Sequence, residues 1–331
     1  MNKIDQVKIL EIETTNICNA SCPQCLRTDE QNNANTNYHD VLDFDQIVGN
    51  IDPVFWKNLD TVNFNGNTGD NIAHPDIKHI VLSVAQLAPQ AMIKVSTNGS
   101  LRNTRWWQDF GQAFSNINGV VIFGIDGLAD THSLYRVGTD YDHVIKNAKA
   151  FIDAGGSAIW QMIPFEHNQH QIADCERLAN ELGFKKFIVR HENRFPADQR
   201  QQLVYFKGKH THTIKASAVE LTDTICQSFG TIDTSSTIQC KSIETNWMAI
   251  YADATVWPCC FLMGWHRSSH QGRAYQTINY HFKKVLGLDF SVLNLYNNKL
   301  EDILNSDIWQ KRYPNSFAHM PNPVCLQQCS I

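Results

Sequence analysis

Short apolar runs alternate with segments of helical periodicity from residue 7 to about residue 192, and this alternation restricts the fold more than any other feature. The intervening segments, such as 77–87 and 141–154, repeat apolar residues three and four positions apart. A strand followed by a helix, repeated about six times, predicts a parallel sheet covered by helices. The predicted strands are residues 7–13, 61–65, 92–97, 120–126, 158–164 and 186–191.

Six such units are too few for a closed eight-stranded barrel, so we expect an α/β fold with a partial (β/α)6 TIM-like barrel. We assign this core to residues 1–195. The alternation then stops, and residues 196–239 are expected to be an irregular bridging region. Residues 240–331 are expected to form a small α+β domain, with a hairpin of 247–251 and 255–257 and a helix near 300–313.

Length and charge restrict the class of protein further. A chain of 331 residues is long enough for two domains, and its net charge of −5 disfavours a broad nucleic-acid-binding surface. No secretory signal or membrane-spanning run is found, so a cytoplasmic location is expected. In that reducing compartment, ten cysteines in tight local groups indicate metal ligands rather than disulfides.

Three of these cysteines, Cys18, Cys22 and Cys25, directly follow the first predicted strand. A closed zinc site takes four protein ligands, and no histidine lies nearby in sequence to provide the fourth. A [4Fe–4S] cluster held by only three thiolates keeps one iron open to a substrate or cofactor. Structural zinc shared with a distant cysteine is the alternative.

The three-cysteine motif, its position after the first strand and the partial barrel resemble the radical S-adenosylmethionine (SAM) enzymes. The resemblance implies a [4Fe–4S] cluster whose open iron binds SAM, and an electron donor such as flavodoxin or ferredoxin. It further implies reductive cleavage of SAM to a 5′-deoxyadenosyl radical that abstracts hydrogen from a substrate. Gln24 departs from the family pattern, which usually has an aromatic residue before the third cysteine, and Gly124 stands where serine is common.

Further motifs resemble the cofactor-binding segments of that family: "NGNTGDNIAHPDI", "STNGSL" and "GIDGLADTHSLYR". In the first, Asp70 would hold the methionine ammonium of SAM, and the two glycines would permit close backbone approach. In the third, Arg136 would be available for a carboxylate. The cofactor-binding residues implied by the resemblance are Gly66, Gly69, Asp70, Ser96, Thr97, Asn98, Asp126, Arg136 and Asn168.

The C-terminal cysteines resemble the SPASM/twitch extension of the same superfamily, which encloses an auxiliary [4Fe–4S] cluster. The resemblance implies Cys240, Cys259, Cys325 and Cys329 as ligands, with Cys260 competing with Cys259. An all-cysteine zinc site has similar spacing and is the alternative. Cys226 is a spare thiol, a hydrogen donor to a substrate radical or a cluster ligand, and Cys260 is a second candidate for a catalytic thiol.

The resemblance implies oxidative modification of a peptide or protein substrate. A radical SAM dehydrogenase for a small carbohydrate or nucleotide is the alternative, and a non-catalytic zinc- or cluster-binding protein is the alternative of another class. The first strand is expected within about ten residues of the start, so we expect no leader-binding module before it. The ending Cys329-Ser330-Ile331 lacks the Gly-Gly tail of the two-cluster molybdopterin-precursor cyclases, which counts against that assignment.

Overall fold

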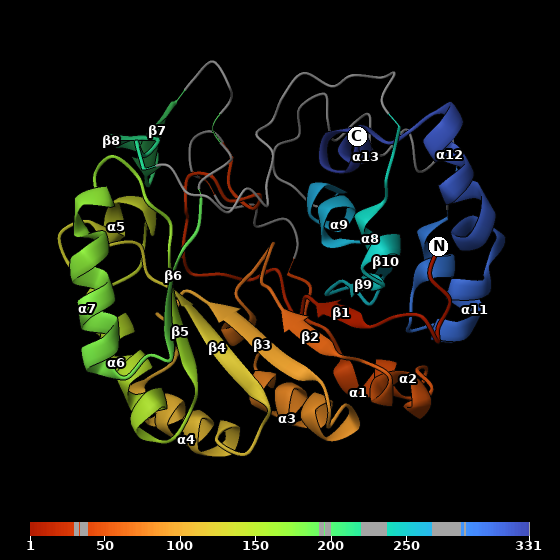
Figure 1. The fold of residues 1–331 in the computed structure, drawn as a ribbon, viewed down its shortest axis with the longest axis horizontal. Coiled ribbons are helices and arrows are strands. Elements are labelled where there is room, and N and C mark those ends of the chain that lie inside the picture. Colours follow the sequence, from red (N-terminus) through yellow and green to blue (C-terminus); the bar gives the residue numbers. More distant parts are fainter. Residues whose placement is uncertain are drawn as a thin grey trace.

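A curved eight-stranded sheet organises the molecule in the computed structural model (Figure 1). The structure describes residues 1–29, 33, 39–191, 195, 200–219, 237–266, 286–287 and 289–330. The strand order is β10-β9-β1-β2-β3-β4-β5-β6, and neighbours from β9 to β6 are parallel. Within the described residues the two outermost strands do not pair with each other, so the sheet stays open. The prediction of a partial barrel is confirmed.

All six predicted strands are observed, with each end within two residues of its expected position; the first, fifth and sixth are shorter than predicted. The sheet strands are β1 Ile9–Ile12, β2 Thr61–Phe64, β3 Met92–Thr97, β4 Gly119–Gly124, β5 Ala158–Met162, β6 Lys186–Val189, β9 Trp247–Ile250 and β10 Val256–Trp257. The helices of the core are α1 Phe44–Val48, α2 Pro53–Lys57, α3 Ile77–Leu87, α4 Thr104–Phe114, α5 His132–Tyr135, α6 Tyr141–Asp153 and α7 Ile172–Leu182, with 3-10 turns η1 Asn71–Ala73 and η2 Gln169–Gln171.

The two faces of the sheet differ in polarity because side chains alternate along each strand. The outer face packs against the helices and is apolar, with Leu10, Val62 and Val95 fully buried in the main core. The opposite, concave face has polar residues at the paired positions Glu11, Asn63 and Lys94. The concave face is therefore polar at these positions of β1 to β3, which the apolar pattern of the sequence did not reveal.

The C-terminal hairpin is present, but it extends the main sheet. β9 lies parallel to β1 in the register Leu10↔Met248, and β10 pairs antiparallel with β9. The remaining C-terminal elements are α8 Lys241–Glu244, α9 Cys260–His266, η4 Phe290–Leu293, α11 Leu300–Asn305, η5 Ile308–Arg312, α12 Tyr313–His319 and α13 Pro323–Cys329. The single helix expected near 300–313 is wrong in detail, since it breaks after Asn305 and continues as a π-helical turn.

The expectation of an irregular bridging region is also wrong in part. β7 Gln201–Phe206 and β8 Lys209–Lys215 form an antiparallel hairpin with Gly208 in its turn at φ +75°. Most of its side chains are polar, so apolar periodicity gave no signal. The hairpin contacts the cysteine loop, because the Gln202 side chain donates a hydrogen bond to the Pro23 carbonyl at 2.7 Å.

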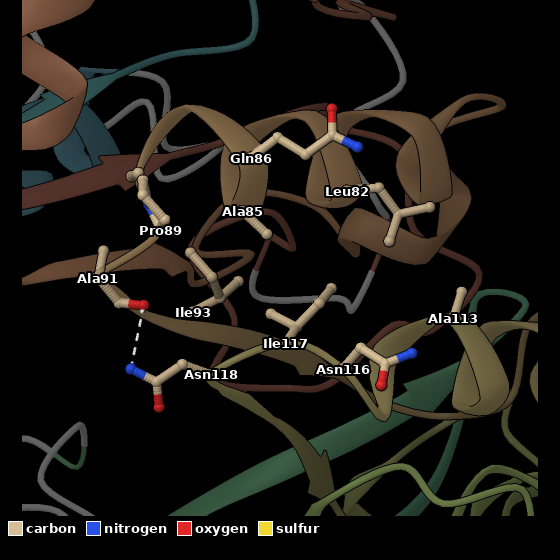
Figure 2. Close-up of a pocket in the computed structure, with 11 residues that line it drawn as sticks. Leu82, Ala85, Gln86, Pro89, Ala91, Ile93, Ala113, Asn116, Ile117 and Asn118 are labelled. Carbon is tan, nitrogen blue, oxygen red and sulfur yellow. Dashed lines mark hydrogen bonds between the residues drawn. The ribbon is translucent and has the colours of Figure 1, made fainter.

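One hollow of about 350 Å³ lies between α3, α4 and the start of β3 (Figure 2). Its lining includes Leu82, Ile93 and Ile117 and contains no charged side chain. It opens at the amino-terminal edge of the strands, so it is separate from the predicted site at their carboxyl-terminal edge. Among the described residues, no helix is both long and apolar enough to cross a membrane.

Candidate cluster and cofactor site

The first cysteine group lies in an irregular loop that follows β1. Cys22 is buried, while Cys18 and Cys25 are half-buried. The Cys25 amide donates to the Cys22 carbonyl at 3.0 Å, and the Thr28 hydroxyl donates to the same carbonyl at 2.8 Å. These local bonds fold the segment that carries the three thiols into a compact loop that contains no helix or strand.

Arg27 fixes the shape of this loop. Its guanidinium donates to the carbonyls of Asn16, Ala20 and Cys18 at 3.0, 3.1 and 3.1 Å. Three bonds from one planar group determine the relative position of these peptide units. The sequence analysis missed Arg27; its place two residues after the third cysteine was the available signal.

The glycine-rich turn after β2 packs directly against the cysteine loop. A Cβ at Gly69 would lie 2.1 Å from the Thr15 carbonyl oxygen, so only glycine fits there. The next amide, that of Asp70, donates to the Ile17 carbonyl at 2.8 Å. Gly66 has a φ of +68° and forms the turn itself. Close approach at Gly69 is thus observed, but the contact is with the protein backbone of the loop.

Asp70 connects the ends of β2 and β3. Its buried carboxylate accepts hydrogen bonds from the Asn98 amide at 2.8 Å, from the Thr97 hydroxyl at 3.0 and 3.1 Å, and from the Ile72 amide at 3.0 Å. Burial raises the pKa of Asp70 despite these donors. The carboxylate therefore organises two loops, and its predicted contact with an ammonium group stays a prediction.

Asn98 reaches from the end of β3 to the first cysteine. Its side-chain amide nitrogen lies 3.6 Å from Cys18 Sγ and donates to Asn19 Oδ1 at 3.0 Å. Ser96 precedes it on the concave face of β3, where it is half-buried. The structure thus brings Thr97 and Asn98 together with Cys18 and Asp70.

The other side of the cysteine loop faces β4 and β5. Asp126 is fully buried; its Oδ2 accepts from Arg136 Nε at 2.6 Å and its Oδ1 from the Ile163 amide at 2.6 Å. Asn168 donates to the carbonyls of Asp126 and Ile163 at 3.2 and 3.1 Å. These residues hold the ends of β4 and β5 together, and their predicted contact with a cofactor stays a prediction.

Two thiols of the loop, Cys18 and Cys22, are poor nucleophiles when free. Burial raises the pKa of Cys18 to about 12 and that of Cys22 to about 11. Such thiols stay protonated at neutral pH unless a metal or another cation stabilises the thiolate. The donor set therefore fits metal ligation better than covalent catalysis.

The second cysteine group comes from three segments of the C-terminal region. Cys240 precedes α8, Cys259 precedes α9, and Cys325 and Cys329 lie on α13. Burial raises the pKa of Cys259 well above its usual value, and the nearby charges of Cys325, Cys240 and Cys329 raise it further. The four predicted ligands therefore lie around one position.

Cys260 points to different neighbours. Burial raises its pKa well above the usual value, and Glu11 is its strongest charged neighbour. Cys259, by contrast, interacts with the other three predicted ligands. Cys259 therefore stays the predicted ligand, with Cys260 as the alternative. Cys226, the other candidate for a catalytic thiol, lies outside the described residues.

In the described part of the chain, no three side chains of His, Cys, Asp or Glu are arranged to hold a single metal ion. A cluster does not require that arrangement, because each thiolate binds a different iron. The spacing of both cysteine groups is therefore consistent with clusters. Neither group has the geometry of a preformed single-ion zinc site.

Two carboxyl groups at the end of β1, Glu11 within it and Glu13 just after it, lie between the cysteine groups and were missed by the sequence analysis. Burial raises the pKa of Glu11 to about 8 and that of Glu13 to about 7. Glu11 contacts Cys260, and Glu13 accepts from the backbone and side-chain amides of Asn67, both at 2.9 Å. Glu13 thereby supports the glycine-rich turn. Their positions two residues apart on one predicted strand were the available signal.

Comparison with known families supports two regions. Residues 12–179 match the model of the radical SAM superfamily, and residues 240–330 match that of SPASM, an iron–sulfur cluster-binding domain. No functionally curated protein matches the chain in sequence.

Several solved structures share the fold. SuiB of Streptococcus suis is 15% identical with a TM-score of 0.56, over 92% of this chain and 67% of SuiB. SuiB bound to the precursor peptide SuiA is 14% identical with a TM-score of 0.56, over 92% of this chain and 66% of that one. The anSMEcpe structure with AdoMet and the Cp18Cys peptide is 12% identical with a TM-score of 0.53, over 97% and 88%. The chain thus spans about two thirds of SuiB, and these likenesses describe the fold alone.

Proposed function

Because the chain belongs to the radical SAM superfamily and has a C-terminal SPASM domain, we propose that it is an enzyme that oxidatively modifies a peptide or protein. The observation that supports this best is the meeting of a three-thiol loop with the ends of four neighbouring strands. Radical SAM enzymes use SAM and a [4Fe–4S] cluster, and a SPASM domain contains additional iron–sulfur clusters. When bound, these groups supply one-electron cleavage of SAM, with transfer of a substrate hydrogen to form 5′-deoxyadenosine.

In this proposal Cys18, Cys22 and Cys25 hold the SAM-binding cluster. Cys240, Cys259, Cys325 and Cys329 hold an auxiliary [4Fe–4S] cluster. The concave face next to the first site provides polar side chains such as Asn63 and Lys94, which suit a peptide backbone or another polar substrate. Buried surroundings exclude water from the reacting atoms and limit side reactions.

One of the chain's own carboxyl groups can receive the proton that an oxidation releases. Burial raises the pKa of Glu13 to about 7, so it is partly ionised at neutral pH and can accept a proton, whereas Glu11, with a pKa raised to about 8, is mostly protonated there. A dehydrogenation removes two hydrogens from the substrate: one is transferred as an atom to the adenosyl carbon, and the other is lost as a proton. The remaining electron would pass to the auxiliary cluster that Cys240, Cys259, Cys325 and Cys329 are proposed to hold. A protein such as flavodoxin or ferredoxin would supply the electron that starts each turnover.

The peptide substrate is supported by fold likeness to SuiB with its precursor peptide and to anSMEcpe with its peptide. The alternative is a dehydrogenase for a small carbohydrate or nucleotide, which the polar concave face would also accommodate. The test is to incubate the anaerobically reconstituted protein with SAM, a reductant and short peptides encoded beside its gene. Mass spectrometry should show a peptide that has lost two hydrogens, in proportion to 5′-deoxyadenosine. Oxidation of sugars or nucleotides and of none of the peptides would favour the alternative.

A further inference from the structure

Arg136 is a buried cation held in one orientation beside the cysteine loop. Its Nε donates to Asp126 Oδ2 at 2.6 Å, and its side chain is only 17% exposed. Asp126 is in turn fixed by the Ile163 amide, which donates to Oδ1 at 2.6 Å. The Arg136 guanidinium lies over the Tyr135 ring, 5.5 Å from its centroid. The ion pair is thus held by two strand ends and a ring.

After Asp126, the side chain whose charge interacts most strongly with Arg136 is Cys22. The neighbours of Arg136 along the chain, Tyr135 and Val137, pack in one apolar cluster with Cys22. The Ser21 amide donates to the Val137 carbonyl at 2.8 Å, which joins the two segments directly. Burial raises the pKa of Cys22, while the charge of Arg136 and its hydrogen bond to the sulfur oppose that rise.

Gly124 provides the space for this arrangement. A Cβ at that position would lie 2.5 Å from Arg136 Nη2 and 3.0 Å from Cζ. Even alanine would therefore displace the guanidinium, since real Cβ atoms do not approach so closely. This contact gives a physical reason for glycine at a position where related enzymes often have serine.

We propose that Arg136, oriented by Asp126, is a positioning residue that raises the reduction potential of the cluster bound through Cys22. The inference rests on the proposed function, because it assumes that Cys18, Cys22 and Cys25 hold that cluster. Reduction adds one electron from an external donor and changes no bond. A fixed cation beside a ligand sulfur favours the more negative, reduced form. The charge of Asp126 acts on Cys22 in the opposite sense and more weakly.

The test is a redox titration of the reconstituted full-length protein, followed by electron paramagnetic resonance without SAM. Arg136→Gln should lower the midpoint potential of the SAM-binding cluster, and Asp126→Asn should raise it. The expected size is about a tenfold change in the ratio of reduced to oxidised cluster at a given potential, which corresponds to about 59 mV for one electron. The Cys18/Cys22/Cys25→Ala variant should contain only the auxiliary cluster, so subtracting its spectrum leaves the signal of the SAM-binding cluster.

Two further variants separate charge from folding. Gly124→Ala keeps both charged residues but displaces the guanidinium, so it should lower the potential, whereas Arg136→Lys should preserve most of it. Arg102→Gln is the control, because Arg102 bonds the Ile72 and His74 carbonyls at 3.1 and 2.8 Å in the neighbouring loop. It should leave the potential unchanged.

Equal potentials in Arg136→Gln, Gly124→Ala and wild type, or shifts of one sign in Arg136→Gln and Asp126→Asn, would overturn the inference. Weaker SAM binding by Arg136→Gln with an unshifted SAM-free potential would do so too and would assign Arg136 to the SAM carboxylate. Those results would leave the proposed function intact. The proposed function itself would fail if the Cys18/Cys22/Cys25→Ala variant kept its full iron content.

Discussion

The two cysteine groups are built in opposite ways. The first places three thiols within eight residues of one loop, supported by Asp70, Asn98 and Asp126 from the ends of other strands. The second takes four thiols from residues 240 to 329. One of them, Cys325, has the Tyr313 hydroxyl as a hydrogen-bond partner, 3.2 Å from its Sγ atom. The loop group thus has polar and charged neighbours, whereas the dispersed group comes from segments that are distant in sequence.

This difference suits two different roles. A three-thiol loop surrounded by orienting side chains can leave one iron open for a cofactor. In the proposed auxiliary site, the four thiols before α8, before α9 and on α13 would fill every ligand position of a cluster, which would then connect these segments. β9 brings the two groups near each other, since it pairs directly with β1.

The largest effect is expected at the second group, where substitution of Cys259 or of the adjacent Cys260 should change the iron content very differently. Cys259→Ala should remove the auxiliary cluster, with a loss of roughly four irons per chain. Cys260→Ala should keep that iron, because Cys260 faces Glu11. Iron and sulfide analysis after anaerobic reconstitution measures both. The opposite result, with iron lost in Cys260→Ala alone, would reverse the ligand assignment.

The next effect is expected at the loop of the first group. Gly69→Ala places a Cβ 2.1 Å from the Thr15 carbonyl oxygen, so the turn or the loop must shift. We expect a loss of stability of about 3 kcal/mol and weaker assembly of the first cluster, with the second unaffected. Gly49→Ala is the matched control, since its nearest contact would be at 4.0 Å. Thermal unfolding and iron content compare the two, and equal behaviour would refute the close approach.

A smaller effect is expected between the groups, at Glu11. Its folded pKa of about 8 is above the usual 4.5, so the folded state binds the extra proton between these values. Stability from this group is full below about pH 4.5 and declines as pH rises through about 8. Glu11→Gln should flatten that decline. The control is Glu244→Gln at the exposed residue Glu244, and unfolding midpoints measured at several pH values in this interval should show no change of slope for it.

The smallest effect is expected at Tyr313. Tyr313→Phe removes only the hydroxyl that bonds Cys325 Sγ. The auxiliary cluster should still assemble, with a lower midpoint potential and about 1 kcal/mol less stability. Phe317→Leu, on the same helix and beside the Tyr313 ring, is the packing control. Identical potentials in Tyr313→Phe and wild type would show that the hydroxyl does not influence the cluster.

Patterns that are local in sequence predicted the core and the first cysteine group. The alternation of strands and helices and the spacing Cys18-x3-Cys22-x2-Cys25 each lie within a short window. The pairing of β9 with β1 could not be predicted in this way, because it joins residues more than two hundred positions apart. The β7–β8 hairpin was not predicted because its strands are mostly polar and show no apolar alternation.

Long-range contacts also decided the details of the site. The space that Gly124 leaves for Arg136, and the contact of Gly69 with Thr15, depend on how separate strand ends meet. Glu11 and Glu13 were included in an apolar strand, and only the sheet register shows that they lie on the concave side. Sequence alone identified the residue types, while the fold determined which of them face one another.

The most direct test of the two-site model is the iron content and the 5′-deoxyadenosine yield of wild type and the Cys18/Cys22/Cys25→Ala variant. Wild type should hold about eight irons per chain and release 5′-deoxyadenosine on reduction with SAM. The variant should keep about four irons and release none. A variant that loses all its iron, or that still cleaves SAM, would contradict the division of labour between the two cysteine groups.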